Sequence, residues 1–482
     1  MQGEKRFEPK LFYDISLSEF IGDDHFLVKL DDVLSLEWIR KRTRSYYSHT
    51  GKPSIDPVVL IKMLLVGYLY DIRSERRLVE EVRLNLAYRW YVGYDLDEEI
   101  PDHSVFSKAR ARFGEGLFCE LFEKILKECV KAGLVSGDGI LVDSTLVRAD
   151  ASLNSVIDVA LPPEKYWREL DQDEKRTDSP RGMKPKDGEA SQVGSHFNQT
   201  VDPKKLGKRR RDRDAAYLRR RSKTDPDATI HYRPGMGSFL SYKVHIAVDT
   251  SGIITAVTAS PSAEHDTSRL PELLGSHART LGLPPAVAAD STYGTSEALT
   301  FLQSKGIKTA IPPMPARGHP GCFPKSAFIH DRKNDLYICP EGKSLRRRAK
   351  YKKTGQIFYK ARGEDCAFCP SRDKCISGKG ARVRSITRID GDHFDNAREY
   401  LCSTNGKALF SLRKTVVEGV FGQSKTFHGL SRAKMRGLEK MRIQALLTTT
   451  VINIKKLVRS CTRNLSCACL FYARWRLMRP SV

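Results

Sequence analysis

With 482 residues the chain has room for two or three domains, and its 40% apolar content is enough for a hydrophobic core. Lys and Arg number 82 against 58 Asp and Glu, so the net charge of +24 indicates a polyanionic partner, DNA or RNA, ahead of a membrane surface. Eleven cysteines at irregular spacing argue against the disulfide framework of a secreted protein and for a reducing cytoplasm.

The N-terminal part, residues 1–134, predicts a helical unit. Pro57 suits the first turn of a helix, and the apolar run Val58–Tyr70 is too short and, with Lys62, too interrupted to cross a membrane. It therefore predicts a core helix, and the charged N-terminus lacks the apolar segment of a signal peptide. A short helix at Val105–Phe113 carries a basic face, which leaves DNA binding and a packing or dimerisation role equally open.

Beyond residue 134 strands and helices alternate, which predicts an α/β unit over residues 135–457. Short apolar runs have the length of strands, and Asp249–Gly252 has the composition of a hairpin turn. The expected strands are Ile140–Val142, Ser238–Val248, Ile253–Ala259, Pro284–Ala289 and Lys308–Ile311. The expected helices are Asp266–Gly282, Ser296–Ser304 and Leu412–Arg459.

Two segments interrupt this unit, and a basic tail, residues 458–482, follows it. Residues 155–237 are rich in Pro, Asp, Lys, Arg and Gly, and Lys204–Lys223 holds eleven basic residues against two acidic ones. Such a block is either a solvated arm or, as we favour from the net charge, an arm that lies on phosphates. The second interruption, residues 313–400, contains several cysteines.

Three carboxylates have the setting of a metal site. Asp143 and Asp290 each end an apolar strand, and Glu418 lies on a basic helix beside an apolar stripe. Singly, such residues most often make a turn contact or a helix salt bridge. Three carboxylates that converge would repel one another unless cations lie between them, and oxygen ligands suit Mg²⁺ or Mn²⁺. Two such ions, about 3.5–4 Å apart, would support phosphodiester chemistry.

Five motifs resemble the DDE transposases of bacterial insertion sequences, and so does the helical N-terminal part. The motifs are Val142-Asp143-Ser-Thr, Tyr242-Lys-Val-His245, Glu264-His-Asp-Thr267, Ala289-Asp290-Ser-Thr-Tyr293-Gly and Val417-Glu418-Gly-Val-Phe-Gly-Gln-Ser-Lys425. The resemblance covers nearly the whole chain, except for the first residues and the tail after about Leu457. Its specificity lies in the order and spacing of the motifs together.

The resemblance implies an RNase H-like core in which Asp143, Asp290 and Glu418 bind two Mg²⁺ or Mn²⁺ ions. These ions would activate water to cut the ends of the element. They would then activate the 3′-hydroxyl of the cut end for attack on the target phosphodiester.

The resemblance also implies accessory contacts to DNA. Lys425 matches the Lys that follows the Glu in the family, whereas Ser411 and Lys414 stand where Tyr and Arg are usual. Arg413 is the candidate to replace that Arg. The residues that we expect to contact DNA are Lys425, Arg413, Lys414, Arg209, Arg210, Arg211, Arg219, Arg220 and Arg221.

The cysteine-containing insert has two interpretations. Cys339, Cys366, Cys369 and Cys375 match the ligand set of a structural Zn²⁺ site, but their spacing is irregular, and reduced, unligated thiols are the alternative.

Other polar residues near the motifs have structural explanations. Asp249 fits a hairpin turn, and Asp266 fits a helix start, which ranks it well below the three acids. We expect His245 in a strand and His265 at a helix start, neither as a metal ligand.

Taken together, we expect an α/β fold with an RNase H-like mixed-sheet core, an all-helical N-terminal domain and the two inserts. The expected function is a DNA transposase acting on the terminal repeats and on target double-stranded DNA, as a homodimer without a membrane partner. The alternatives are a non-catalytic DNA-binding protein and an RNase H-like nuclease without strand transfer. No Gly-rich loop of the P-loop or dinucleotide-binding kind follows a strand. We expect the protein in the bacterial cytoplasm, on the nucleoid.

Overall fold

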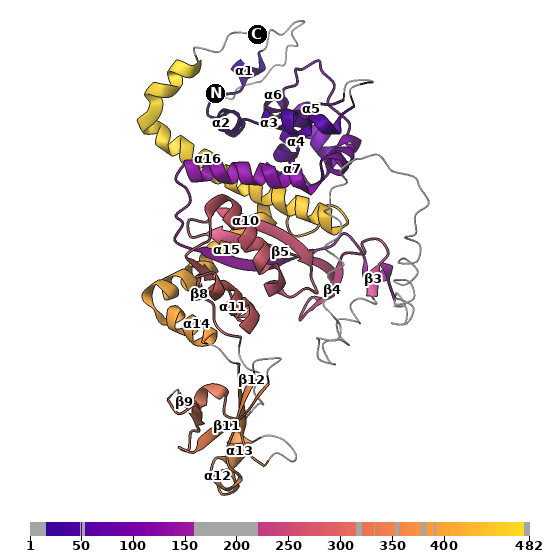
Figure 1. Ribbon diagram of the computed structural model, residues 1–482. Coiled ribbons are helices and arrows are strands. Elements are labelled where there is room, and N and C mark those ends of the chain that lie inside the picture. The colour runs from indigo at the N-terminus through magenta and orange to yellow at the C-terminus, as the bar shows by residue number, and fades with distance from the viewer. Residues whose placement is uncertain are drawn as a thin grey trace, which may run out of the picture.

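The computed structural model describes residues 16–48, 50, 54–158, 220–314, 321–331, 333–351, 356–376, 382–389 and 392–476. Figure 1 shows helices of the N-terminal part at the top, a mixed sheet below them and a second, smaller sheet at the bottom. The structure is thus mixed α/β with a helical N-terminal region, in agreement with the expected class.

The N-terminal region is helical, as predicted. Its helices are α1 (Leu17–Phe20), α2 (Phe26–Val33), α3 (Trp38–Thr43), α4 (Pro57–Leu69), α5 (Glu75–Leu84), α6 (Leu86–Val92) and α7 (Ser104–Lys131). Helix α4 begins at Pro57 because the preceding Asp56 accepts a hydrogen bond from the Val58 backbone N–H. Helix α7 contains Gly114 at φ 62°, a conformation that favours glycine, and this kink directly follows the short helix expected at Val105–Phe113.

The main sheet places its strands in the order β4-β5-β1-β7-β8, and β6 also pairs with β5. The strands are β1 (Ile140–Arg148), β4 (Thr229–Arg233), β5 (Gly237–Asp249), β6 (Ile254–Pro261), β7 (Ala286–Ala288) and β8 (Lys308–Ala310). Strand β5 is antiparallel to β1 and β6, whereas β1, β7 and β8 are parallel. Parallel strands have their carboxyl ends at one edge of the sheet, which brings the residues after β7 beside β1.

Helices cover both faces of this sheet. Helix α10 (Leu270–Leu281) and α11 (Ser296–Ser304) share a buried cluster with Val142 and Val287. On the other face lie α15 (Thr404–Phe427) and α16 (Leu438–Arg476), which pack with Leu141 and with the N-terminal helices. Figure 1 shows α16 running between α7 and the sheet, so this one helix joins the helical region to the α/β core.

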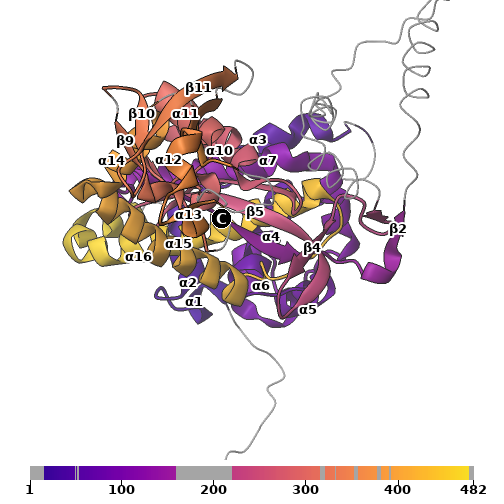
Figure 2. The ribbon, with the colours of Figure 1, turned by 90° about the horizontal axis from the view of Figure 1, so that it is seen from below.

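The second sheet is built from the residues of the cysteine-containing insert. Its strands are β9 (Ile329–Asp331), β10 (Leu336–Ile338), β11 (Ser344–Tyr351), β12 (Gln356–Lys360) and β13 (Ser385–Ile389), and each strand pairs with the next one in the chain. The helices α12 (Gly363–Ala367) and α13 (Arg372–Cys375) lie in the chain between β12 and β13. This sheet has a small core of its own around Tyr337 and Tyr359. Figure 2 views the molecule from the side of this sheet.

The structure differs from the sequence expectations at the first interruption and at the tail. Strand β4 lies within the expected insert 155–237 but pairs with β5 in the main sheet. Strands β2 (Val156–Asp158) and β3 (Arg220–Ser222) pair with each other, and residues 159–219 between them lie outside the described residues. Helix α16 continues past residue 458, where we expected the tail to begin. In the described residues, no helix combines the length and the apolar character needed to cross a membrane.

Candidate active site

Asp143 lies on β1, directly after the buried residues Ile140–Val142. Its Oδ2 is 2.7 Å from Nη1 of Arg413 on α15, and its Oδ1 accepts a hydrogen bond from the Ser144 backbone N–H at 2.8 Å. Burial raises the pKa of Asp143 to about 6, against the lowering effects of the Ser144 N–H and Arg413. The carboxyl groups of Asp290 and Asp266 are smaller contributions to the same rise, so three acids act on one another at this place.

Asp290 follows β7 and caps the short helix η6 (Ser291–Tyr293). Its Oδ1 accepts from the Thr292 backbone N–H at 2.9 Å, and its Oδ2 accepts from the Thr292 hydroxyl at 3.1 Å. In the parallel pairing of β1 with β7, Leu141 lies opposite Ala288. Asp143 and Asp290 each come two residues later, so Asp143 lies within β1 just beyond its pairing with β7, and Asp290 follows the end of β7 close by.

Asp266 is a third acid at this place, although the sequence interpretation ranked it low. It opens the short helix η5 (Asp266–Arg269), as expected, but its Oδ1 also lies 2.9 Å from Nζ of Lys243 on β5. Burial is the main cause of the raised pKa values of Asp143 and Tyr293, and the charge of Asp266 raises both as well. The sequence did contain a signal for this contact. Lys243 and Asp266 each lie in one of the five motifs that resemble the transposases.

Glu418 lies on α15 beside the buried Val417 and Val420, as its helical pattern predicted, and its side chain is exposed. The charged side chains that shift the pKa of Asp143 are Arg413, Asp290 and Asp266. Among the described residues, no three Asp, Glu, His or Cys side chains form a group that could hold a metal ion. The structure therefore brings Asp143 and Asp290 together, and among the described residues it forms no three-residue metal-binding group that includes Glu418.

The chemistry of the site suits a hard divalent cation. Asp143 and Asp290 offer carboxylate oxygens at a partly buried edge of the sheet, which are the ligands that Mg²⁺ and Mn²⁺ prefer. The Arg413 guanidinium supplies the positive charge that a half-buried Asp143 requires. The two aspartates fit as ligands of such an ion.

The basic residues of the same helix lie at different depths. Lys414 is exposed, whereas Lys425 is partly buried. Burial lowers the pKa of Lys425, and the positive charge of Arg233 on β4 lowers it as well. Arg220 and Arg221 are on β3. The other expected DNA contacts, Arg209, Arg210, Arg211 and Arg219, lie outside the described residues.

The expected histidines and turn residues have the structural roles that we predicted. His245 is buried in β5, where Nε2 is 2.9 Å from the Ser260 hydroxyl, and burial lowers its pKa to about 4. His265 caps η5 by accepting from the Thr267 N–H. Asp249 accepts hydrogen bonds from Ser251 and from the chain before β1.

The four cysteines of the insert all lie in the second-sheet module. Cys366 and Cys375 are part of its buried core, and Cys339 packs against it. Burial raises the pKa of Cys375, Arg384 lowers it, and the neighbouring Cys366, Cys369 and Cys339 add to the rise. The four residues therefore gather in one place, without three of them forming a ready metal-binding group among the described residues.

Comparison with known families gives two matches. Residues 15–112 match the family described as Transposase domain (DUF772), and residues 338–458 match the Transposase DDE domain. The second match contains Arg413, Glu418 and Lys425, whereas Asp143 and Asp290 lie between the two matched ranges. No curated protein matches the chain.

Proposed function

The chain belongs to the DDE transposases of insertion sequences, and from this premise we propose that it cuts DNA at element ends and joins them to target DNA. The proposed catalytic residues are Asp143, Asp290 and Glu418. The observation that carries this proposal is the position of Asp143 on β1 and of Asp290 directly after the neighbouring parallel strand β7, each two residues beyond the paired Leu141 and Ala288.

We propose that the main sheet is an RNase H-like core. Its support is the order β6-β5-β1-β7-β8, in which the first three strands are antiparallel neighbours and the last three are parallel. In this proposal residues 135–457 form the catalytic domain with its two inserts, α16 continues beyond it to Arg476, and residues 1–134 serve DNA binding or dimerisation.

Asp143 and Asp290 would hold Mg²⁺ or Mn²⁺, and Glu418 would complete the ligand set from α15. A pair of such ions activates the attacking oxygen and stabilises the leaving oxygen of an in-line phosphoryl displacement. The residues of the chain itself position these ligands: Thr292 holds the Asp290 carboxylate, and Arg413 holds that of Asp143. A cation at Asp143 would compete with Arg413 for the same oxygen, and a displaced Arg413 would be free to contact a DNA phosphate.

DNA binding follows from the transposase domains, and the net charge of +24 supplies the electrostatic attraction. We propose that Lys425, Lys414 and Arg413 line the path of the element end, and that the basic block Lys204–Lys223 lies on its phosphates. Two element ends must be brought together for joining, so we propose a homodimer.

The test is cleavage of a supercoiled plasmid that carries the flanking element ends, in Mg²⁺, Mn²⁺ or EDTA. We expect metal-dependent cutting by the wild type and none by Glu418→Gln. The matched control is Glu399→Gln, which changes an exposed glutamate on the neighbouring helix α14 (His393–Cys402). Tight binding without cutting by any form would favour a non-catalytic DNA-binding protein, and cutting without joined products would favour a nuclease.

A further inference from the structure

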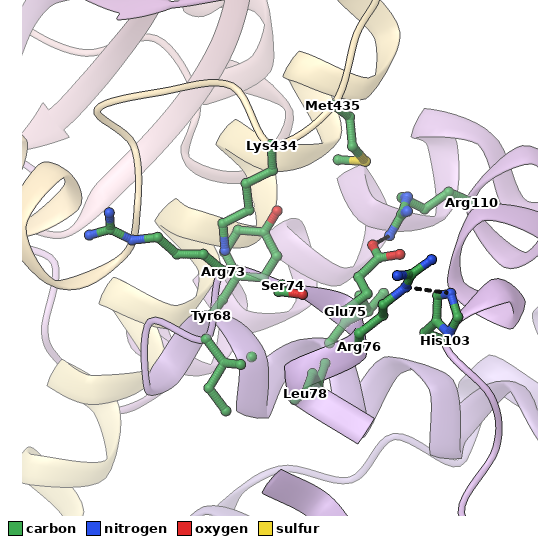
Figure 3. Close-up of a pocket in the computed structure, with 13 residues that line it drawn as sticks. Tyr68, Arg73, Ser74, Glu75, Arg76, Leu78, His103, Arg110, Lys434 and Met435 are labelled. Atoms are coloured by element: carbon green, nitrogen blue, oxygen red, sulfur yellow. Dashed lines mark hydrogen bonds and ion pairs between the residues drawn. The ribbon is translucent and has the colours of Figure 1, made fainter. Parts of the chain in front are cut away.

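A pocket of about 300 Å³ lies between the N-terminal helices and the loop that joins α15 to α16. Its apolar lining includes Leu64 of α4, Ile72 and Leu78. Figure 3 shows basic side chains around it: Lys434 and Arg73 on one side, and Arg76 and Arg110 on the other. The pocket therefore combines an apolar lining with positive charge, which is a setting for an anionic ligand.

Two of these cations are already neutralised by carboxylates. Nη1 of Arg110 lies 2.5 Å from Oε1 of Glu75, and Nη2 of Arg73 lies 2.9 Å from Oδ2 of Asp71. These ion pairs shape the wall of the pocket and leave little charge for a ligand.

The other two cations have uncharged partners. Nζ of Lys434 lies 4.1 Å from the centre of the Tyr68 ring, and Nε of Arg76 donates to Nε2 of His103 at 3.2 Å. Within the described residues neither has a carboxylate oxygen within 4.0 Å, and the lining contains one acid, Glu75, which is held by Arg110. Burial lowers the pKa of Lys434 to about 8, although the charges of Asp71 and Glu75 act in the opposite direction.

We propose that this pocket binds a phosphate group of the DNA backbone, with Lys434 and Arg76 as its ligands. This proposal rests on the proposed function, and it adds a contact to the DNA backbone outside the three catalytic acids. A compact ammonium and a planar guanidinium on two sides of a cavity are suited to the oxygens of one phosphate. The cation–π contact with Tyr68 and the hydrogen bond to His103 hold the two side chains in place without neutralising them.

The position of Lys434 links the pocket to the candidate active site. The loop that carries it is hydrogen-bonded to the end of β1: the Arg148 N–H donates to the Ser431 carbonyl at 3.2 Å, and the Ala433 N–H donates to the Arg148 carbonyl at 2.7 Å. Strand β1 also carries Asp143, and α15 before the loop carries Glu418. A phosphate held at Lys434 would therefore fix the DNA in a defined position relative to the acids.

The experiment is binding of a fluorescent duplex that contains an element end, at several salt concentrations, to full-length Lys434→Met and Arg76→Met. We expect each variant to bind roughly 3–10-fold more weakly and to lower the slope of log K against log salt by about one. The matched controls are Lys440→Met, exposed on α16, and Arg77→Met, which neighbours Arg76 but pairs with Glu81. Thermal melts establish that each variant is folded.

A second measurement reports on the pocket directly. Duplex should protect Lys434 from acetylation, read by peptide mass spectrometry, more than it protects Lys440, and AMP at the same phosphate concentration should not. Wild-type affinity and salt slope in both folded variants would overturn the pocket while leaving DNA binding intact. Protection by AMP alone would replace DNA with a free nucleotide as the ligand. A wild type that binds no duplex would overturn the proposed function as well.

Discussion

Nη1 of Arg413 lies 2.7 Å from Oδ2 of Asp143, and both side chains are largely buried. The residues are 270 positions apart, so this ion pair fastens α15, which carries Glu418, to the strand β1. A divalent cation at Asp143 would compete for the oxygen that Arg413 contacts. Metal binding and release of Arg413 should therefore be linked, which makes the protonation of Asp143 central to the site.

Asp143→Asn should stabilise the metal-free protein at pH 7.5. The folded state raises the pKa of Asp143 to about 6, above its value in the unfolded chain, so the group stabilises the fold only below the unfolded pKa. That contribution is lost as the pH rises from about 4 to about 6. Removing the ionised carboxylate should raise stability by about 1–3 kcal/mol at pH 7.5 and by less at pH 4.5. Thermal melts in EDTA measure this, and equal effects at both pH values would contradict it.

Each of the three acids should be necessary for cutting and dispensable for DNA binding. We expect Asp143→Ala, Asp290→Asn and Glu418→Gln to lose plasmid cleavage while they retain wild-type affinity for the duplex. Asn is used at position 290 because it can still cap η6, whereas Ala would also cost about 1 kcal/mol through the lost cap. Cleavage by any one of these variants would remove that residue from the catalytic set.

Asp266→Asn should shift the acid limb of the pH–cleavage profile to lower pH. Its charge raises the pKa of Asp143, so without it Asp143 ionises at lower pH. Freeing Lys243 from its 2.9 Å ion pair leaves a positive charge nearby and acts in the same direction. The control is Glu297→Gln, an exposed glutamate on α11, which should leave the profile in place. A complete loss of cutting would instead assign Asp266 to the metal ligands.

The local elements of the site could be predicted from the sequence because they depend on neighbours in the chain. Pro57 gave the start of α4, and apolar runs gave the start of β1 and the position of β7. The end of β1 was predicted too early, because the strand continues through Asp143 to Arg148. The contact of Asp143 with Arg413 joins residues far apart in the chain, which periodicity does not report. The ion pair of Lys243 with Asp266 was missed for the same reason, because a helix start already explained the local pattern at Asp266.

The second sheet escaped prediction for a different reason. Strand β11 has the sequence Ser-Leu-Arg-Arg-Arg-Ala-Lys-Tyr, in which Leu345 is fully buried and the arginines around it are exposed. So many basic residues resemble a solvated loop, and only pairing with β10 and β12 reveals the strand. Strand β4 was likewise placed in the basic insert because its composition is polar.

If the zinc interpretation of the cysteine-containing insert holds, the second-sheet module should take up one zinc ion per chain. Its buried core is small, and a module of this size usually needs a further constraint. The module contains the four cysteines of the insert, Cys339, Cys366, Cys369 and Cys375. In the part of the chain that the structure describes, their thiols do not yet form a metal-binding group, so zinc binding requires them to move into tetrahedral positions around one ion. Metal analysis of protein purified without chelator should give one zinc, and Cys366→Ser with Cys369→Ser should give none. Four freely titrating thiols and no zinc would support the alternative of reduced cysteines.

Neutralising the basic block Lys204–Lys223 should weaken DNA binding and flatten its salt dependence. The block carries eleven basic residues against two acidic ones, and each phosphate contact that is lost removes counterion release from the binding free energy. Replacing Arg209, Arg210 and Arg211 by Gln should lower the slope of log K against log salt by about two to three, equally for element ends and for unrelated duplex. Arg346→Gln with Arg348→Gln, on exposed positions of β11, removes two positive charges outside the block and controls for a general loss of charge. An unchanged slope in the triple variant would make the block a linker that does not touch DNA.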